Sequence, residues 1–356
     1  MKQYLAATFA AALATPLHAG SLLSQFDSFY VLGDSLSDNG NTFNLLQRAG
    51  LSPTSRALQQ EGVSSDSFTW AKEFTDVFGP NGENLSFGAA RANDNGDIIP
   101  DLFAQISAEP EAVPFLNKYQ DGLGGLAARI GDGSDRELVT VFIGGNDFLD
   151  AAEATGAKLQ DAAIAQATLG DAAAATVLAS LQTDLATLTQ KTLTTVIGGV
   201  QSIIGLDVND LIVMTLPDFS VIPAFNGALA PVGAALAETA KTYNTLLEME
   251  LDKLRSDTVK ITTVDIFDAL SDTTLLAEAG FTDIDNACID AGVTRCEGFL
   301  YFDGIHPASQ GHALIAAQTR EALAETYAPV PLPASALFLL SALGAGVVIR
   351  RRRQQA

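Results

Sequence analysis

The sequence predicts an α/β protein in which helices cover both faces of a parallel sheet. Short, apolar, β-branched segments alternate along the chain with longer segments of helical character. This alternation is typical of strand–helix–strand units, because parallel strands need a crossover connection between them. The chain has 356 residues, 47% of them hydrophobic. That suffices for one large α/β domain, although length alone would also allow two.

Five segments have the strand pattern. They are short, mainly apolar and β-branched, as expected of strands that are covered on both faces. The expected strands are residues 29–32, 84–87, 139–143, 211–215 and 260–266.

Four longer segments are expected to be helices, and the second of them is rich in alanine. They are residues 66–78, 158–195, 231–255 and 308–326.

The sequence predicts further features of the second and third of these helices. The stretch 147–205 is longer than a simple crossover requires and predicts a helical hairpin. That hairpin would either roof a substrate groove or pack as a plain outer-layer helix. Residues at helical spacing predict one apolar side for the helix at 231–255. This side consists of Leu236, Ala240, Tyr243, Leu247 and Met249.

A tight turn that contains a serine follows the first expected strand. The sequence GDSL at 33–36 comes directly after the apolar run 29–32 and is followed by SDNGN at 37–41. A strand that breaks into such a turn presents Ser35 at the strand's carboxyl end, near the start of the next helix. Unpaired helix N–H groups favour developing negative charge there. Taken alone, Ser35 could equally be a helix N-cap.

Two other expected strands end in hydrogen-bond donors. Gly88 follows the second strand, and its backbone N–H can approach a ligand closely because no Cβ intervenes. Asn146 follows Gly144 and Gly145 after the third strand and offers a side-chain amide. Alone, Asn146 and Asp147 would also fit a simple Asx turn.

An aspartate and a histidine complete the set. Asp303 and His306 are three residues apart, so the carboxylate can orient the imidazole while the other ring nitrogen faces a serine. The chain has only two other histidines. His18 lies in an apparent signal peptide, and His312 lies in an expected helix without an acidic residue at a useful spacing. We interpret His312 as a helix-surface or packing residue.

The four stretches resemble the sequence blocks of the GDSL/SGNH hydrolase family, in the order that the family uses. They are residues 33–41, 84–91, 139–147 and 302–307, and the match extends from about residue 26 to about residue 327. The resemblance implies a three-layer α/β/α, flavodoxin-like fold with a five-stranded parallel sheet in the order 2-1-3-4-5. The turns would meet at the carboxyl edge of that sheet.

The resemblance also implies a role for each residue. Ser35 would be the nucleophile, His306 the general base and acid, and Asp303 the residue that orients His306. The oxyanion hole would consist of the backbone N–H groups of Ser35 and Gly88 and the side-chain amide of Asn146.

The activity that the resemblance implies is that of a secreted serine esterase or lipase, which hydrolyses carboxylic esters through an acyl-enzyme and needs no cofactor. Transfer of the acyl group to a sterol or a sugar is an alternative within the family. A non-catalytic surface or matrix scaffold is a further alternative, although a binding module would not need all five residues. One departure is that Ala89 stands where many relatives carry a second glycine; it leaves the expected donor, Gly88, unaffected.

The N-terminal residues 1–19 read as a secretory signal peptide. Lys2 precedes an apolar stretch, and Ala19 is the expected cleavage point. An N-terminal core helix is the alternative. The remaining 20–329 would form the hydrolase domain.

The C-terminal residues 330–356 read as a sorting signal. The sequence VPLPA at 330–334 precedes an apolar run to Ile349, and four arginines follow at 350–353. The pattern resembles a PEP-CTERM signal of the VPLPA type, which implies processing by an exosortase-type enzyme in a Gram-negative bacterium. A plain tail anchor is the alternative. Either interpretation anchors the protein to the membrane only through this segment, at least transiently. Either also places the hydrolase domain at the cell surface, outside the cell or in the periplasm.

The net charge limits the classes of partner that the protein is expected to bind. The formal net charge is −22, and removal of both ends would take away five cations and no acidic residue, giving −27. So acidic a domain is not expected to bind nucleic acid, and anionic membrane surfaces would repel it. A neutral small-molecule or lipid ester is therefore a more suitable substrate than a phosphate-rich one.

Cys288 and Cys296 are the only cysteines. Their closeness and the export signal predict a disulfide, with free thiols as the alternative. Two cysteines and three histidines do not favour a Cys/His metal site. The acidic turns at 94–97 and 132–135 lack the full spacing of a calcium loop, so no metal site is predicted.

Overall fold

The computed structural model describes residues 22–51, 62–107, 125–131, 135–293 and 295–327. The expected signal peptide (1–19) and the expected sorting signal (330–356) lie outside these residues, so both stay predictions. Within the described ranges, no helix combines the length and the apolar character needed to cross a membrane.

A five-stranded parallel sheet forms the centre of the protein, in the order β2-β1-β3-β4-β5. This confirms the α/β fold and the strand order that the sequence predicts. Every residue of β1, β3 and β4 is buried, as expected where helices cover both faces of a sheet. The strands are β1 Ser28–Gly33, β2 Gly82–Asn84, β3 Glu137–Phe142, β4 Asp210–Met214 and β5 Lys260–Val264.

The second strand ends earlier than expected. β2 stops at Asn84, whereas the sequence predicts a strand over 84–87. The backbone N–H groups of Leu85 and Phe87 still donate to the carbonyls of Val31 and Gly33. The predicted segment therefore runs along β1 as an irregular extension of the strand, and it delivers Gly88 to the end of β1.

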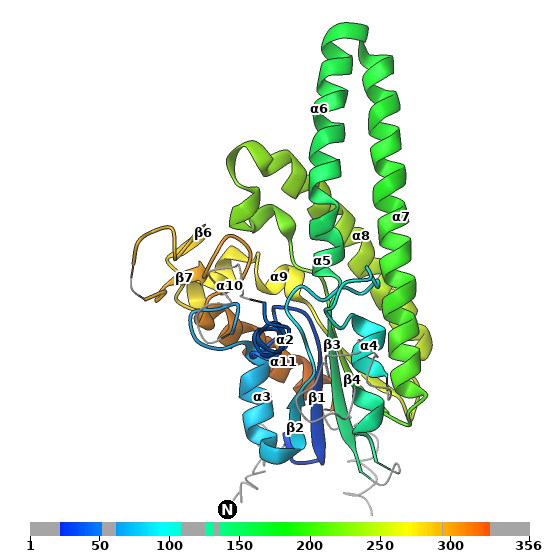
Figure 1. Ribbon diagram of the computed structural model, residues 1–356, viewed down its shortest axis with the longest axis vertical. Coiled ribbons are helices and arrows are strands. Elements are labelled where there is room, and N and C mark those ends of the chain that lie inside the picture. The colour runs from blue at the N-terminus through cyan, green and yellow to red at the C-terminus, as the bar shows by residue number, and fades with distance from the viewer. Residues whose placement is uncertain (1–21, 52–61, 108–124, 132–134, 294, 328–356) are drawn as a thin grey trace, which may run out of the picture.

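Helices lie on both faces of the sheet (Figure 1). On one face, α3 (Trp70–Phe78) and α11 (Ser309–Thr326) pack against each other. On the other face, α4 (Leu102–Ile106) packs on α7 (Asp171–Ile204), and α7 packs on α8 (Ala230–Leu254). The shorter elements are α2 Asn41–Arg48, α5 Gly145–Asp150, α9 Ile266–Ala269, α10 Thr273–Glu278, η1 Gly79–Asn81, η2 Leu126–Ala128, η3 Phe219–Val221, η4 Pro223–Phe225 and η5 Gly227–Leu229.

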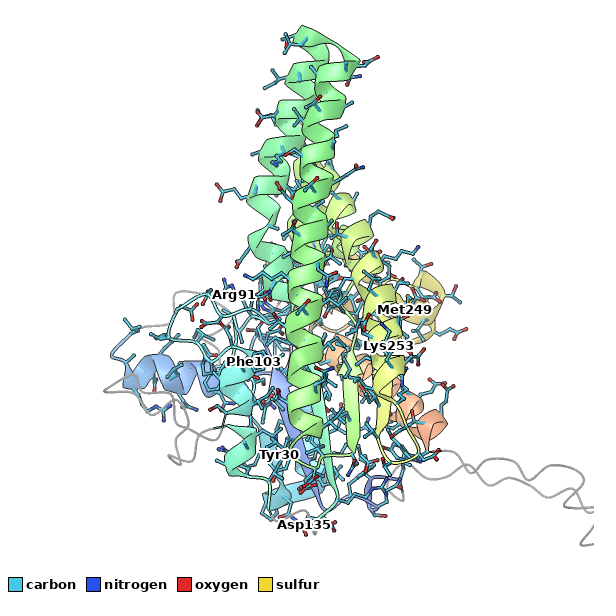
Figure 2. All side chains as sticks on the ribbon, turned by 90° about the vertical axis from the view of Figure 1, so that its right-hand side faces the viewer. Tyr30, Arg91, Phe103, Asp135, Met249 and Lys253 are labelled. Atoms are coloured by element: carbon cyan, nitrogen blue, oxygen red, sulfur yellow. A yellow bond between two sulfur atoms is a disulfide. The ribbon has the colours of Figure 1, made fainter. Side chains whose placement is uncertain are left out.

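The apolar side of α8 differs from the prediction at one position. Leu236, Ala240, Tyr243 and Leu247 are buried as expected, but Met249 is 56% exposed and is labelled on the outer surface in Figure 2. Met249 lies two residues after Leu247, which places it on a different side of the helix. The buried stripe continues instead at Leu251.

A long helical hairpin follows α5, as the sequence predicts. It consists of α6 (Ala152–Leu169) and α7 (Asp171–Ile204), which meet at Gly170. The hairpin projects beyond the carboxyl edge of the sheet (Figures 1 and 2). The last turns of α7 are buried in the core through Val196, Val200 and Ile203. Neither helix lines the cavity beside Ser35, so α7 packs as an outer-layer helix rather than as a roof.

A small second sheet was not predicted. β6 (Asp283–Ala287) and β7 (Phe299–Tyr301) pair in parallel. Two of the β6 residues are exposed and most of its side chains are polar, so it lacks the apolar pattern of a buried strand. β7 leads directly into the Asp303–His306 turn.

Candidate active site

The turn after β1 is fixed by backbone hydrogen bonds and by close packing. The N–H groups of Ser37 and Asp38 donate to the Asp34 carbonyl, and the N–H of Leu36 donates to the Asp34 carboxylate at 3.0 Å. At Gly33, an added Cβ would lie 2.6 Å from the Phe142 carbonyl oxygen of β3. Only glycine fits there, so the close β1–β3 contact holds Ser35 at the carboxyl edge of the sheet.

Ser35, His306 and Asp303 form a continuous hydrogen-bonded chain. Ser35 Oγ lies 2.9 Å from His306 Nε2. On the other side of the ring, His306 Nδ1 lies 2.9 Å from Asp303 Oδ2 and 3.0 Å from Oδ1. The structure therefore brings together the three side chains expected from the sequence, although 271 residues separate Ser35 from His306.

The environment of Asp303 favours its charged form. Burial alone would raise its pKa, but the hydrogen bond and the charge of the His306 imidazole lower it, and the pKa lies below its ordinary value. The backbone N–H groups of Ile305 and His306 contribute by donating to Oδ1 at 2.8 Å. An ionised carboxylate thus faces Nδ1 of the ring.

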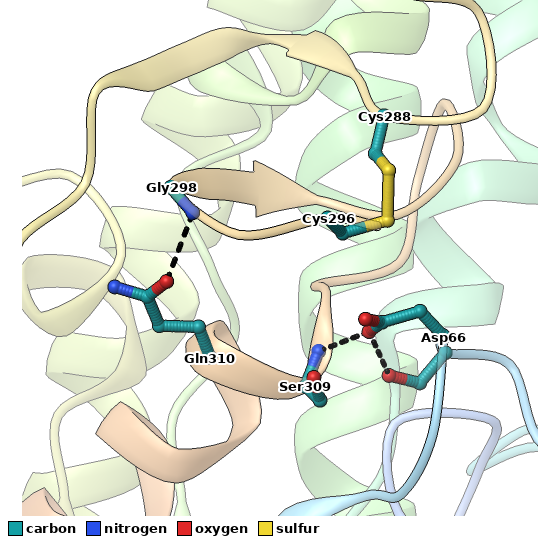
Figure 3. Close-up of a disulfide and its surroundings, with 7 residues drawn as sticks. Asp66, Cys288, Cys296, Gly298, Ser309 and Gln310 are labelled. Atoms are coloured by element: carbon teal, nitrogen blue, oxygen red, sulfur yellow. Dashed lines mark hydrogen bonds between the residues drawn. A yellow bond between two sulfur atoms is a disulfide. The ribbon is translucent and has the colours of Figure 1, made fainter. Parts of the chain in front are cut away.

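The Asp303–His306 turn is held at both of its ends. The Phe302 N–H donates to the His306 carbonyl, and the Ala308 N–H donates to the Leu300 carbonyl. On the neighbouring segment, the Cys288 N–H donates to Tyr301 and the Ile289 N–H to Phe302. A disulfide joins Cys288 to Cys296 beside this ladder (Figure 3).

We expect Cys288 and Cys296 to be bonded in the purified protein. A disulfide between residues 8 apart in sequence lowers the conformational entropy of the unfolded chain. By the loop-entropy relation this stabilises the folded protein by about 2–3 kcal/mol. The double substitution Cys288→Ser with Cys296→Ser should therefore lower the free energy of unfolding by about that amount. Peptide mass spectrometry with alkylation before and after reduction checks the bond, and alkylation of both thiols without reduction would exclude it.

Gly88 lies beside Ser35, but its N–H is already engaged. An added Cβ at Gly88 would lie 3.7 Å from the Ser35 Cβ. The Gly88 N–H donates to the Asp38 carboxylate at 3.0 Å. Asp38 is buried and also accepts the N–H groups of Gly40, Asn41 and Thr42. The oxyanion donor expected at Gly88 is therefore directed at a carboxylate.

The N–H of the next residue has no acceptor within the described part of the chain. This residue, Ala89, is exposed and has φ of 66°, a left-handed conformation that glycine adopts far more readily than alanine. The N–H of Ser35 likewise has no acceptor among the described residues. The sequence signal for the left-handed backbone was the glycine that many relatives carry at the Ala89 position.

Asn146 joins the loop after β2 to the turn after β3. Its amide Nδ2 donates to the Ala90 carbonyl at 2.9 Å, and the second amide hydrogen is left for another acceptor. Asn146 and Ser35 line the same cavity.

Asp147 ties the same two loops together. It accepts the N–H groups of Ala92 and Asn93 and the side-chain amide of Asn93. Asn93 in turn contacts Thr192 and Thr195 of α7. Asn146 is therefore held against the loop after β2 by its own amide and by the bonds of its neighbour Asp147.

The family follows from a comparison that covers most of the chain. The sequence model of the GDSL-like lipase/acylhydrolase family matches residues 29–319. The chain belongs to this family. As a member it is a carboxylic ester hydrolase with the SGNH-type α/β fold. The first three sequence blocks lie at the ends of β1, β2 and β3 of the central sheet, and the fourth follows β7 of the second sheet and reaches Ser35 through His306. Small-molecule esters are the substrates that suit this family.

Two solved structures are similar to this GDSL family member. One is the acetyl xylan esterase AlAXEase, with 12% sequence identity and a TM-score of 0.39; the match covers 83% of this chain and 98% of the other. The second is a variant of Axe2, an acetyl-xylooligosaccharide esterase from Geobacillus Stearmophilus, with 14% identity and a TM-score of 0.40, over 85% and 97% of the two chains. No curated protein sequence matches the chain.

Two buried acids, Asp34 and Asp38, lie in the turn that carries Ser35 in this GDSL hydrolase. Burial raises the pKa of Asp34 to about 7 and also raises the pKa of Asp38 above its ordinary value. The N–H groups that donate to each carboxylate oppose this rise.

The remaining histidine of the described chain has no part in this cluster. His312 is fully buried in α11, and neither of its ring nitrogens has a hydrogen-bond partner within the described residues. Burial lowers its pKa to about 3. It is therefore a neutral packing residue and not a surface residue. No group of acidic, histidine and cysteine side chains within the described residues is arranged to hold a metal ion.

Proposed function

We propose that this GDSL hydrolase is an exported serine esterase that acts through an acyl-enzyme on Ser35. The observation that carries the proposal is the hydrogen-bonded chain from Ser35 Oγ through His306 to Asp303. A serine hydroxyl is a weak nucleophile unless an adjacent base takes its proton, and the base must itself be oriented by a third group.

The proposed reaction uses this geometry in two steps. His306 Nε2 takes the Ser35 proton as Ser35 Oγ attacks the ester carbonyl carbon. The alcohol leaves with that proton, and Ser35 keeps the acyl group. His306 then takes a proton from a water molecule as the water attacks the acyl carbon, and it returns this proton to Ser35 Oγ as the acid leaves. Because its pKa is lowered, Asp303 stays ionised and stabilises the imidazolium that forms in both steps.

Three N–H groups are proposed to stabilise the oxyanion: those of Ser35, of the Asn146 side chain and of Ala89. Ala89 replaces Gly88 in this role, because the Gly88 N–H donates to Asp38, whereas Ala89 is an exposed residue whose N–H has no acceptor in the described chain. In a crystal structure with a phosphonate on Ser35, the phosphonyl oxygen should accept from Ala89. An oxygen held by Gly88, with Asp38 displaced, would contradict this assignment.

Substitution of Asn146 by alanine should lower kcat by about 10²–10³-fold and leave KM nearly unchanged. Loss of one oxyanion donor removes an interaction that strengthens in the transition state. Steady-state kinetics on a soluble ester check this, with Asn95→Ala in an exposed turn as the control. A large rise in KM at unchanged kcat would instead make Asn146 a substrate-binding residue.

Hydrolysis of short- and long-chain p-nitrophenyl esters by the purified protein tests the esterase proposal. The expected result is Ser35-dependent release of p-nitrophenol. Product analysis with an added sterol or sugar distinguishes hydrolysis from acyl transfer. Release at the rate of buffer alone for every ester would favour a non-catalytic scaffold.

Export is the second part of the proposal. Residues 1–19 would direct secretion, and an exosortase-type enzyme would remove the C-terminal segment near 330–334, after it has served as a transient anchor. The support is the order of a proline-containing motif, an apolar run and four arginines.

We therefore expect the mature protein from its native host to lack residues Arg350 to Arg353. Intact-mass analysis measures this directly. A mature mass that still includes the four arginines would make the segment a permanent tail anchor, and it would leave the catalytic proposal unaffected.

A further inference from the structure

A small apolar cavity lies directly beside Ser35. Its volume is about 30 Å³. Its polar lining includes Asp34, Ser35 and Asn146. The remaining wall is largely apolar and includes Leu36, Leu149, Phe219, Ile222, Leu270 and Tyr301.

Part of the cavity wall is built from side chains that are packed in the core. Phe219, Ile222 and Leu270 are 1–3% exposed. The Phe219 ring stacks on Phe148 with 5.7 Å between centroids and meets Phe225 edge-on at 6.3 Å. Close-packed side chains of this kind do not yield without strain elsewhere, so the cavity cannot lengthen easily to admit a larger group.

The two halves of an ester make different demands on such a cavity. The acyl group stays attached to Ser35 until water releases it, so it can occupy an apolar pocket that begins at the nucleophile. The alcohol must leave after the first step, and water must replace it, so that half needs an open path. An apolar cavity bounded by core side chains suits the acyl half.

We propose that this cavity is the acyl pocket and that it restricts the enzyme to esters of short acyl chains, of about two to four carbons. A water-sized group needs about 10–15 Å³ of such volume, so the cavity holds two or three non-hydrogen atoms beyond the carbonyl carbon. The inference rests on the proposed Ser35 mechanism and adds the acyl specificity to it.

Longer chains gain nothing further from the pocket. A methylene that stays in water adds no burial energy, and a methylene forced into the pocket strains its walls and lowers affinity. Discrimination of about 10–200-fold for each misfitted methylene is usual in apolar pockets. We therefore expect kcat/KM to fall at least about 10-fold between the butyryl and the octanoyl ester.

The experiment compares kcat/KM for p-nitrophenyl acetate, butyrate, hexanoate and octanoate, each below its micelle-forming concentration. Leu270→Ala removes a buried side chain from the cavity wall, so it enlarges the cavity and should raise the octanoate-to-acetate ratio about 10-fold. Leu276→Ala is the matched control, because Leu276 is equally buried, at 1% exposed, lies six residues further along, and does not line the cavity. Its ratio should equal that of the parent protein.

A second variant keeps the proposal testable if Leu270→Ala does not fold. Leu149 is only half-buried, so Leu149→Ala should fold and should shift the ratio in the same direction as Leu270→Ala. Equal kcat/KM for acetate and octanoate in the parent protein would overturn the pocket and leave the esterase proposal in place, as would an unchanged ratio in both variants. Absence of Ser35-dependent hydrolysis of every ester would overturn the esterase proposal itself, and the acyl pocket with it.

Discussion

Replacement of Ser35 by alanine should reduce ester hydrolysis by at least about 10⁴-fold while the protein stays folded. The substitution removes the oxygen that lies 2.9 Å from His306 Nε2, and no cysteine lies in the cluster to replace it. Residual turnover would come from the oxyanion donors and from substrate binding alone. Initial rates on a soluble ester, together with thermal unfolding, measure both parts of the expectation.

Ser37→Ala is the matched control for this variant. Ser37 lies in the same turn and is fully buried, and its Oγ accepts the indole N–H of Trp70 at 3.1 Å. Its loss should cost about 1 kcal/mol of stability and leave most of the activity. Activity near the parental level in a folded Ser35→Ala protein would remove Ser35 from the nucleophile role.

Asp303→Asn should lower kcat by about 10⁴-fold, the effect seen for the equivalent change in a serine protease. The new amide oxygen can still accept the N–H groups of Ile305 and His306, so the turn should keep its shape. The amide nitrogen, however, donates a hydrogen toward His306 Nδ1. Nδ1 must then be the acceptor, which places the ring hydrogen on Nε2, and Nε2 can no longer take the Ser35 proton.

The measurement is kcat across pH for the parent protein, Asp303→Asn and the exposed control Asp285→Asn. The control should behave as the parent does. A kcat for Asp303→Asn within a few-fold of the parental value at all pH would show that His306 does not depend on this carboxylate.

The placement of Ser35 and Asn146 was predictable because the turns that carry them follow the buried strands β1 and β3. β1 ends at Gly33, glycines follow β3 at 144–145, and parallel pairing of Gly33 with Phe142 aligns the two ends. Once the strands are parallel and adjacent, Ser35 and Asn146 must meet at one edge. The other two residues of the site were predictable because Asp303 and His306 are only three residues apart in the sequence.

The orientation of individual N–H groups could not be predicted in the same way. Gly88 and Ala89 are adjacent, and the sequence favours Gly88 because it has no Cβ. The proposed choice of the Ala89 N–H rests on Asp38, which lies 50 residues before Gly88 and accepts four N–H groups in a buried position. It also depends on the left-handed backbone at Ala89, a conformation that an alanine gives no reason to expect.

Other differences arise where tertiary contacts override the local pattern. Met249 is an apolar residue, so the sequence predicts it on the apolar side of α8, but the buried stripe of this helix passes through Leu247 and Leu251. The strand β6 is polar and partly exposed, so pairing with β7, rather than apolar character, makes it a strand. His312 is buried without a polar partner in the described chain, which nothing in its neighbouring sequence indicates.

A crystal structure of the protein after reaction with an alkyl phosphonate tests the proposed mechanism most directly. We expect phosphorus bonded to Ser35 Oγ, with a phosphonyl oxygen that accepts from Ser35, Ala89 and Asn146. The alkyl chain should enter the cavity between Leu149 and Leu270. Phosphorus on another residue, or an unmodified Ser35 in a protein whose esterase activity the phosphonate has abolished, would contradict the assignment of Ser35 as the nucleophile.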